Sequence, residues 1–203
     1  LNLLLGMLLG AGLGVGLAFT LEYLDNSVKT AEDIERMNLR VLGMVPRIDT
    51  VELEEKAKAQ GSDNGSFGEE GKRIEQRLIT HFDPKSPISE AYRTLRTNLQ
   101  YITPDDPLKS ILVTSAGPGE GKSTTAANLA IIMGQMGNKT ILVDADLRRP
   151  VVHKIFHRSR TPGLTDVLMQ NKTWRDVLKD SETGNLDIIT SGNLPPNPSE
   201  LLG

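Results

Sequence analysis

The chain has 203 residues, of which 23 are lysine or arginine and 26 are aspartate or glutamate, with no cysteine and a formal charge of −3. This length fits one domain of ordinary size. The mildly acidic balance offers no basic face for DNA or RNA, which excludes nucleic acid as the main partner. The absence of cysteine excludes a disulfide framework and thiolate metal sites.

Residues 1–24 are predicted to form a transmembrane helix. Leu1–Thr20 contains no charged residue, and a helix of about 20 residues spans the ~30 Å hydrocarbon core of a bilayer. A secretory signal peptide is the alternative, but the segment lacks an initiator methionine, a basic start and a cleavage pattern. Gly6, Gly10 and Gly14 have the spacing of a helix-packing motif, although glycine is also simply tolerated in membrane helices.

Residues 25–50 are predicted to form a short juxtamembrane module. Thr30 followed three residues later by Asp33 predicts a capped helix that runs to about Met37. Val41–Val45 is predicted to be a strand, because it is apolar and a proline follows it.

Residues 51–80 are predicted to be a flexible linker, since they are polar and have Gly61–Ser66 at their centre. Both ends of the sequence are expected to be internal to a longer chain. Leu1 opens inside an apolar run, and 198–202 has the pattern of the first turn of a helix.

Residues 81–203 have the pattern of an α/β fold. Short apolar runs predict strands at Ile111–Val113, Thr140–Val143 and Leu186–Thr190. Helices are predicted at Pro87 to about Tyr101, with Ser86 as the cap, and at Thr124–Met136, Val152–His157, Leu164–Met169 and Trp174–Lys179. The alternation predicts a parallel sheet that is covered on both faces. Trp174 is expected in the core.

A glycine-rich loop between the first predicted strand and the following helix matches the Walker A pattern, from Ala116 to Ser123. Glycines let backbone N–H groups turn toward a phosphate, and the helix that begins near Lys122 directs its positive dipole end at the same anion. A structural glycine turn is the alternative. The residues expected to bind ATP are Gly117, Pro118, Gly119, Glu120, Gly121, Lys122, Ser123 and Thr124. In this pattern Lys122 reaches the β and γ phosphates, and the Ser123 hydroxyl binds Mg²⁺.

Asp144 and Asp146 follow the second predicted strand. Alternate residues of an extended segment project to the same side, and ligands of open α/β sheets bind at the carboxyl ends of strands. Such a pair can hold a metal ion and accept a proton from an attacking hydroxyl. A turn closed by aspartate side chains is the alternative.

Four stretches together carry a family resemblance: Phe82–Arg93, Ser115–Ser123, Ile141–Pro150 and Pro195–Leu202. With them, the chain resembles the bacterial tyrosine kinases (BY-kinases), in the subgroup joined to a chain-length-determinant (Wzz-type) membrane module for exopolysaccharide export. The resemblance implies an α/β fold with a partial P-loop NTPase sheet, preceded by the transmembrane helix and the linker.

The resemblance also implies roles for individual residues. Lys122, Asp144 and Asp146 are implied to be catalytic, with Asp144 at the magnesium ion and the incoming tyrosine hydroxyl and Asp146 supporting activation of the acceptor. The family assembles rings through a Glu-x-x-Arg-x-x-Arg helix, which Glu90, Arg93 and Arg96 match. These three fall within one arc of about 120° on a helix; a solvated charged face is the alternative.

The implied protein is an ATP- and Mg²⁺-dependent tyrosine autokinase, anchored in the inner membrane, that works with the polysaccharide export machinery. Because ATP is cytoplasmic, the kinase domain is expected on the cytoplasmic side. Two family features do not occur in this sequence: a further apolar strand ending in Asp-x-x-Pro, and a tyrosine-rich tail, since the only tyrosines are Tyr23, Tyr92 and Tyr101. These 203 residues by themselves are therefore expected to bind ATP poorly and to phosphorylate nothing.

Two other functions fit parts of the same pattern. A positioning ATPase of the MinD/ParA type shares the fold, but these proteins usually have lysine where Gly117 stands here. A membrane scaffold that sets polysaccharide chain length, with a regulatory nucleotide domain, is the other alternative.

Overall fold

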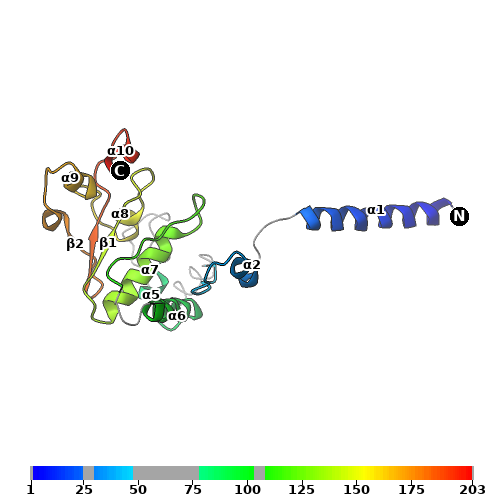
Figure 1. The fold of residues 1–203 in the computed structure, drawn as a ribbon, viewed down its shortest axis with the longest axis horizontal. Helices are drawn as coiled ribbons and strands as arrows, with labels where there is room; N and C mark the ends of the chain where they lie inside the picture. Colours follow the sequence, from blue (N-terminus) through cyan, green and yellow to red (C-terminus); the bar gives the residue numbers. More distant parts are fainter. Residues whose placement is uncertain (1, 25–29, 48–77, 103–107, 203) are drawn as a thin grey trace, which may run out of the picture. The chain divides into compact units, whose positions relative to one another are not determined.

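The computed structural model describes residues 2–24, 30–47, 78–102 and 108–202. The chain divides into two compact units, Leu1–Val41 and Leu42–Gly203. Figure 1 gives the elements of both units in chain order.

The described part of the first unit contains two helices, α1 (Asn2–Leu24) and α2 (Ala31–Arg36). The predicted cap of α2 is confirmed: the Asp33 N–H donates to Thr30 Oγ1 at 3.3 Å, and the Thr30 N–H donates to Asp33 Oδ2 at 3.1 Å. Within the described residues, no helix has both the length and the apolar character needed to cross a membrane. The predicted transmembrane span of residues 1–24 is therefore not confirmed.

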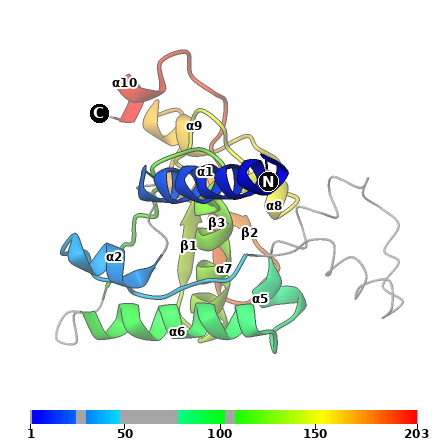
Figure 2. The same cartoon turned by 90° about the vertical axis from the view of Figure 1, so that its right-hand side faces the viewer.

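The second unit is built from short helices around a small sheet (Figures 1 and 2). Among its described residues, the helices are α5 (Ile79–Phe82), α6 (Pro87–Ile102), α7 (Lys122–Gln135), α8 (Val152–Ile155), α9 (Leu164–Leu168), the 3-10 helix η1 (Trp174–Val177) and α10 (Pro198–Leu202). Its strands are β1 (Thr140–Val143), β2 (Lys179–Asp180) and β3 (Leu186–Ile189). The predicted cap of α6 is present, because Ser86 Oγ accepts the N–H of Ser89 at 3.1 Å.

The sheet has the strand order β1-β3-β2. As predicted, β1 and β3 are parallel, with Leu142 opposite Ile188. The short strand β2 pairs antiparallel with β3, so the sheet is mixed and not wholly parallel. The chain enters β2 where a helix from Trp174 to Lys179 was predicted; the helical part ends at Val177.

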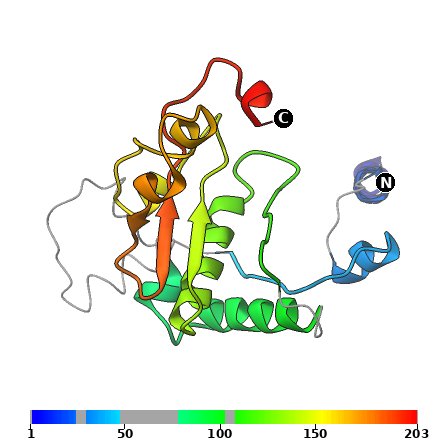
Figure 3. The same ribbon diagram turned by 60° about the vertical axis from the view of Figure 1, so that its left-hand side comes forward.

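One face of β1 carries the core. Leu142 packs with Ile131 of α7 and Ile188 of β3 in the main apolar cluster, and α7 runs along the sheet in Figure 3. Ile141 and Val143, which alternate with Leu142, are exposed. The prediction that the sheet is covered on both faces is therefore wrong for β1 within the described residues.

The predicted strand Ile111–Val113 is not a strand in the structure. Leu112 is 87% exposed, and a groove of about 760 Å³ lies among residues that include Ile111, Val113, Leu129 and Ile141. A strand needs a hydrogen-bonding partner, and β1 and β3 pair with each other without including this segment. An apolar run alone was not sufficient to predict a strand.

The predicted strand Val41–Val45 is also absent. Within the second unit, Leu42 O instead accepts a hydrogen bond from Asn98 Nδ2 at 2.7 Å, and Val45 packs on a small apolar cluster that includes Tyr92. The segment is therefore held by a helix and not by a neighbouring strand.

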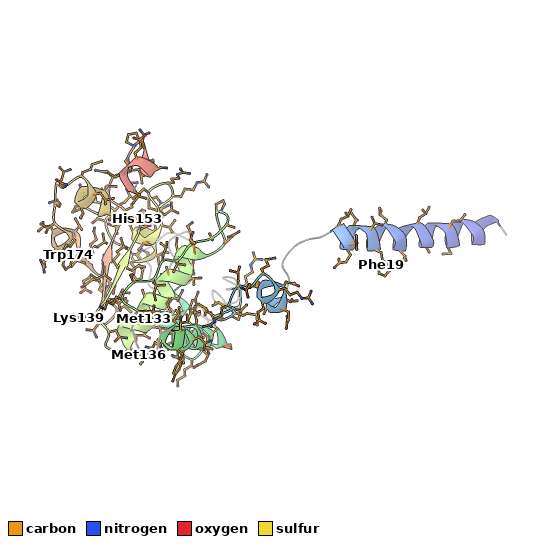
Figure 4. The ribbon with its side chains drawn as sticks, in the orientation of Figure 1. Phe19, Met133, Met136, Lys139, His153 and Trp174 are labelled. Carbon is orange, nitrogen blue, oxygen red and sulfur yellow. The ribbon has the colours of Figure 1, made fainter. Side chains whose placement is uncertain are left out.

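Two further predictions need correction. Most of the predicted linker lies outside the described residues, but Leu78, Ile79 and Thr80 at its end are buried, so the folded unit begins before residue 81. Trp174 is 44% exposed (Figure 4), with the guanidinium of Arg175 at 4.5 Å from its ring centroid. Val177 of the same helix is the residue that enters the core.

Candidate functional site

The Walker A loop lies directly before α7, which begins at Lys122 as predicted. Gly119 and Gly121 have φ angles of 80° and 89°, a backbone conformation that glycine adopts without steric cost. The first helical backbone hydrogen bond of α7 runs from the N–H of Thr125 to the carbonyl oxygen of Gly121, at 2.8 Å. The amides ahead of it are those that a helix leaves without intrahelical partners.

These features fit a phosphate ligand. The two left-handed glycines form the turn, and the amides of the first turn of α7 point their dipole toward the loop. The loop residues present are therefore suited to a nucleoside triphosphate.

Lys122 connects this loop to the end of β1. Its Nζ lies 3.1 Å from Asp146 Oδ2, and the two side chains are 32% and 23% exposed. The predicted neighbourhood of the phosphate loop and the two aspartates is thus present in the structure. The arrangement brings one ammonium and two carboxylates to the carboxyl edge of the sheet.

The two aspartates have different surroundings. The Asp144 carboxylate is buried, and it accepts the N–H of Asp146 at 3.2 Å and the N–H of Val152 at 3.1 Å. Burial raises the pKa of Asp144 above its ordinary value, against the effect of these two amides.

Asp146 closes a turn as well as facing Lys122. Its Oδ1 accepts the amides of Arg148 at 3.2 Å and Arg149 at 2.9 Å. Burial alone would raise the pKa of Asp146, but the Arg149 amide and Lys122 together hold it below its ordinary value. For Asp146 the turn and the site interpretations are therefore compatible, because Oδ1 accepts the turn amides and Oδ2 faces Lys122.

The described residues contain no group of three or more His, Cys, Asp or Glu side chains arranged as metal ligands. Mg²⁺ in phosphate sites commonly takes one or two protein ligands and completes its shell with water and phosphate oxygens. Ser123 and Asp144, the two residues predicted to hold it, fit that donor chemistry.

The charged helix α6 presents the predicted Glu90–Arg93–Arg96 set. Arg93 Nη1 lies 2.5 Å from Glu90 Oε1, and Arg93 Nη2 donates to Pro84 O at 2.7 Å. The Arg96 Nε atom is buried and has no hydrogen-bond partner in the described part of the chain. Glu90 and Arg93 are thus joined within the chain, and the role of the three in assembly stays a prediction.

Sequence reasoning missed three buried polar side chains on α5, α6 and α7. Tyr92, Asn128 and Thr80 are each at most 1% exposed, and Asn128 Oδ1 accepts from Thr80 Oγ1 at 2.9 Å. The available signal was Asn128 itself, an amide within the otherwise apolar run Ala126–Ile132.

Comparison with known proteins finds similarity to bacterial tyrosine kinases. Residues 108–200 match the family described as AAA domain. The chain is 49% identical over 132 residues to the tyrosine-protein kinase YwqD of Bacillus subtilis (strain 168), a match that covers 65% of this chain and 56% of YwqD. It is 29% identical over 202 residues to the tyrosine-protein kinase etk of Escherichia coli (strain K12), covering all of this chain and 28% of that protein.

Among solved structures, the BceF tyrosine kinase domain superposes with a TM-score of 0.70 at 31% identity. The superposition covers 87% of this chain and 67% of that domain. The chain thus spans a little over half of YwqD and about two thirds of the BceF domain.

Proposed function

The chain belongs to the bacterial tyrosine-protein kinases, and we propose that it is part of an ATP-dependent protein-tyrosine autokinase that regulates exopolysaccharide polymerisation and export. One observation carries the proposal: Lys122 of the Walker A loop lies 3.1 Å from Asp146 at the end of β1. A phosphate-binding cation and a carboxylate pair therefore share one edge of the sheet.

The proposed reaction transfers the γ-phosphoryl group of ATP to a tyrosine hydroxyl. The tyrosine oxygen forms a bond to the γ phosphorus, the bond from that phosphorus to the β-γ bridging oxygen breaks, and ADP leaves. The hydroxyl proton passes to the carboxylate pair Asp144–Asp146. The protein supplies mainly position and charge, as is general for this reaction.

Each part of the site has a proposed task. The loop from Gly117 to Thr124 holds the phosphates through backbone amides, and Lys122 offsets charge on the β and γ phosphates. Ser123 and Asp144 hold Mg²⁺, which neutralises phosphate charge when it is bound. Asp146 supports the acceptor hydroxyl.

We also propose that α6 forms the contact between subunits of a ring. Its Glu90 and Arg93 side chains are 63% and 34% exposed, so both are available to a second copy. Replacing Glu90, Arg93 and Arg96 together by alanine should lower self-association of the full-length protein in sedimentation velocity while Mg·ADP binding persists. Unchanged association would contradict the interface.

Membrane attachment is proposed for the first unit. The described side chains of α1 are exposed, including large apolar ones such as Met7, Leu13 and Phe19, and an exposed apolar surface of this kind marks a membrane or protein contact. Fractionation of cells with and without residues 1–24 tests this part, because the shortened protein should leave the membrane pellet.

The test of the activity uses the full-length protein with Mg²⁺ and ATP. Phosphotyrosine measured by mass spectrometry should accumulate in the unchanged protein and fall at least tenfold in Lys122→Ala. Lys172→Ala, an exposed lysine in another part of the unit, is the matched control and should behave as the unchanged protein. Equal phosphorylation in Lys122→Ala would contradict the proposal.

The Lys122→Ala variant, expressed in cells, also distinguishes the kinase function from a scaffold function. If regulation depends on the kinase, Lys122→Ala should lose control of polymer length. A scaffold whose nucleotide domain is only regulatory should keep part of that control.

A further inference from the structure

The first four residues of the second unit, Leu42–Val45, lie along helix α6 of the same unit (Figures 2 and 3). We call this segment the strap. At its start, Asn98 Nδ2 donates to the Leu42 carbonyl oxygen at 2.7 Å. At its next residue, Gly43, an added Cβ would lie 3.6 Å from Leu95 Cβ. The strap backbone therefore passes directly beside the second half of α6.

The other end of the strap reaches the apolar core. Val45 is half-buried and packs on the cluster that contains Tyr92, whereas its neighbour Met44 is 74% exposed. The contacts thus pass from Asn98 to Leu95 to Tyr92 as the strap runs forward. Six helical residues cover about 9 Å, and three steps of an extended chain cover about 10 Å. The strap therefore runs antiparallel to α6 with matched spacing.

The strap lies on the side of α6 opposite the charged residues of that helix. The row that it follows, residues 92, 95 and 98, is displaced by two residues from the row Glu90, Arg93 and Arg96. Each residue of a helix turns by about 100°, so the two rows are about 200° apart. Docking of the strap and a subunit contact through the charged row are therefore compatible on one helix.

The docked strap shortens the covalent connection between the two units. Helix α2 of the first unit ends at Arg36, and residues 37–41 separate it from the strap. If the strap leaves α6, the connection becomes residues 37–77, because Leu78 is buried in the main core. A chain extends at most about 3.6 Å per residue. The two connections therefore allow at most about 20 Å and about 150 Å.

The contacts of the strap are of a kind that can open without unfolding the unit. They include an exposed hydrogen bond from Asn98 and the half-buried side chain of Val45. Segments with few buried apolar contacts and exposed hydrogen bonds open locally at low cost in free energy. Docking of the strap is therefore expected to be reversible.

We propose that the strap is a releasable docking element that sets how far the second unit reaches from the first. Docked on α6, the strap keeps the unit that carries the Walker A loop on a short connection; released, it gives that unit a connection several times longer. The docking goes beyond the proposed function and does not require nucleotide. Its consequence, that release widens the set of tyrosines a subunit can phosphorylate, rests on the proposed function.

The test measures distances in the full-length protein by double electron–electron resonance. Residues 1–203 contain no cysteine, so spin labels are attached to Arg36→Cys at the end of α2 and Gln100→Cys on α6, both at exposed positions. Any cysteine elsewhere in the full-length protein is replaced by serine. Dilution with unlabelled protein restricts the signal to distances within one chain.

Two neighbouring substitutions in the strap give opposite expectations. Val45→Asp places a carboxylate against the apolar cluster and should release the strap, which lengthens the mean distance by at least about 10 Å and broadens its distribution. Met44→Asp adds the same charge at an exposed position and is the matched control. Its distance distribution should stay as narrow as that of the unchanged strap.

A competing peptide tests the docking without changing the protein. A peptide with the sequence of residues 39–47 should displace the strap and lengthen the same distance. It is added at millimolar concentration, because an attached segment competes at an effective concentration of about that size. The same peptide carrying Val45→Asp should leave the distance unchanged.

The outcomes separate this inference from the proposed function. Longer distances with both Val45→Asp and the unmodified peptide support the strap, and any other result overturns it. In particular, a lower melting temperature in Val45→Asp with no effect of the peptide would show that Val45 only packs in the core. If the distances respond as expected but the unchanged protein forms no phosphotyrosine with Mg²⁺ and ATP, the proposed function fails and the docking stands.

Discussion

The ammonium of Lys122 and the carboxylate of Asp146 form an ion pair of 3.1 Å between the phosphate loop and the end of β1. The same ammonium is the group expected to meet the phosphates of ATP. We expect Asp146 and a phosphate to compete for this one cation, so that nucleotide binding weakens the ion pair.

This competition predicts opposite effects for the two partners. Without Mg²⁺, Asp146→Asn should tighten ADP binding by up to about fivefold, because a partly exposed ion pair is worth about 0–1 kcal/mol. Lys122→Met should weaken the same binding at least tenfold, since the charge-assisted contact itself is removed. Calorimetric titration with ADP in EDTA measures both, and weaker Mg²⁺-free binding in Asp146→Asn would contradict the competition.

A second prediction concerns pH and His153 of α8. Burial, together with Arg160 and Lys154, lowers the pKa of His153, and its Nδ1 is buried with no hydrogen-bond partner among the residues that the structure describes. Protonation of His153 is therefore easier in the unfolded chain than in the folded one. The free energy of unfolding is highest above the ordinary histidine pKa, and it decreases as pH falls below that value. Melting temperatures at pH 7.5, 6.5 and 5.5 should fall more steeply in the unchanged protein than in His153→Gln. His81→Gln, which changes an exposed histidine, should keep the unchanged slope.

A third prediction concerns the close contact at Gly163. A Cβ at this position would lie 2.2 Å from Thr190 O and 2.3 Å from the Gly192 nitrogen, which are backbone atoms that cannot yield locally. Gly163→Ala should therefore lower the free energy of unfolding by about 3 kcal/mol. The matched change Gly43→Ala, whose new Cβ would meet Leu95 at an ordinary 3.6 Å, should stay within about 1 kcal/mol. Urea unfolding followed by circular dichroism measures both, and equal midpoints would show that the backbone adjusts.

A fourth prediction concerns Lys179, which joins β2 to the loop around Pro162. Its Nζ donates to Thr190 Oγ1 at 2.7 Å and to the carbonyl oxygen of Pro162. Burial lowers the pKa of Lys179, so part of the gain from these bonds is offset by desolvation. Lys179→Met, which keeps the aliphatic chain, should cost about 1–2 kcal/mol in the same urea experiment. Lys172→Met changes an exposed lysine and should have no measurable effect.

The elements with strong local signals were predicted accurately. The Walker A glycines, the Ser86 cap of α6 and the strand β1 occupy the predicted residues. In each case the signal comes from neighbours in sequence: a left-handed glycine, a capping hydroxyl, or an apolar run that pairs along its length.

Predictions that depended on distant partners were less accurate. Ile111–Val113 is apolar and mostly β-branched like a strand, but it pairs with no strand in the described part of the chain. Trp174 is a large apolar residue of the kind expected in a core, but it lies at the surface. The antiparallel strand β2 was missed because two residues are too few to show a periodic pattern. Whether a side chain is buried depends on what packs against it, and composition does not contain that information.

The sequence by itself determined a phosphate-binding loop at the start of a helix and two aspartates at the end of a strand, because backbone conformation at these places depends on residues a few positions apart. The tertiary structure alone decided that Lys122 faces Asp146, that Asp144 is the buried carboxylate, and that the Thr80 hydroxyl donates to Asn128. These relationships join residues up to 48 positions apart along the chain. They exist only where packing of the apolar core brings the helices and strands together.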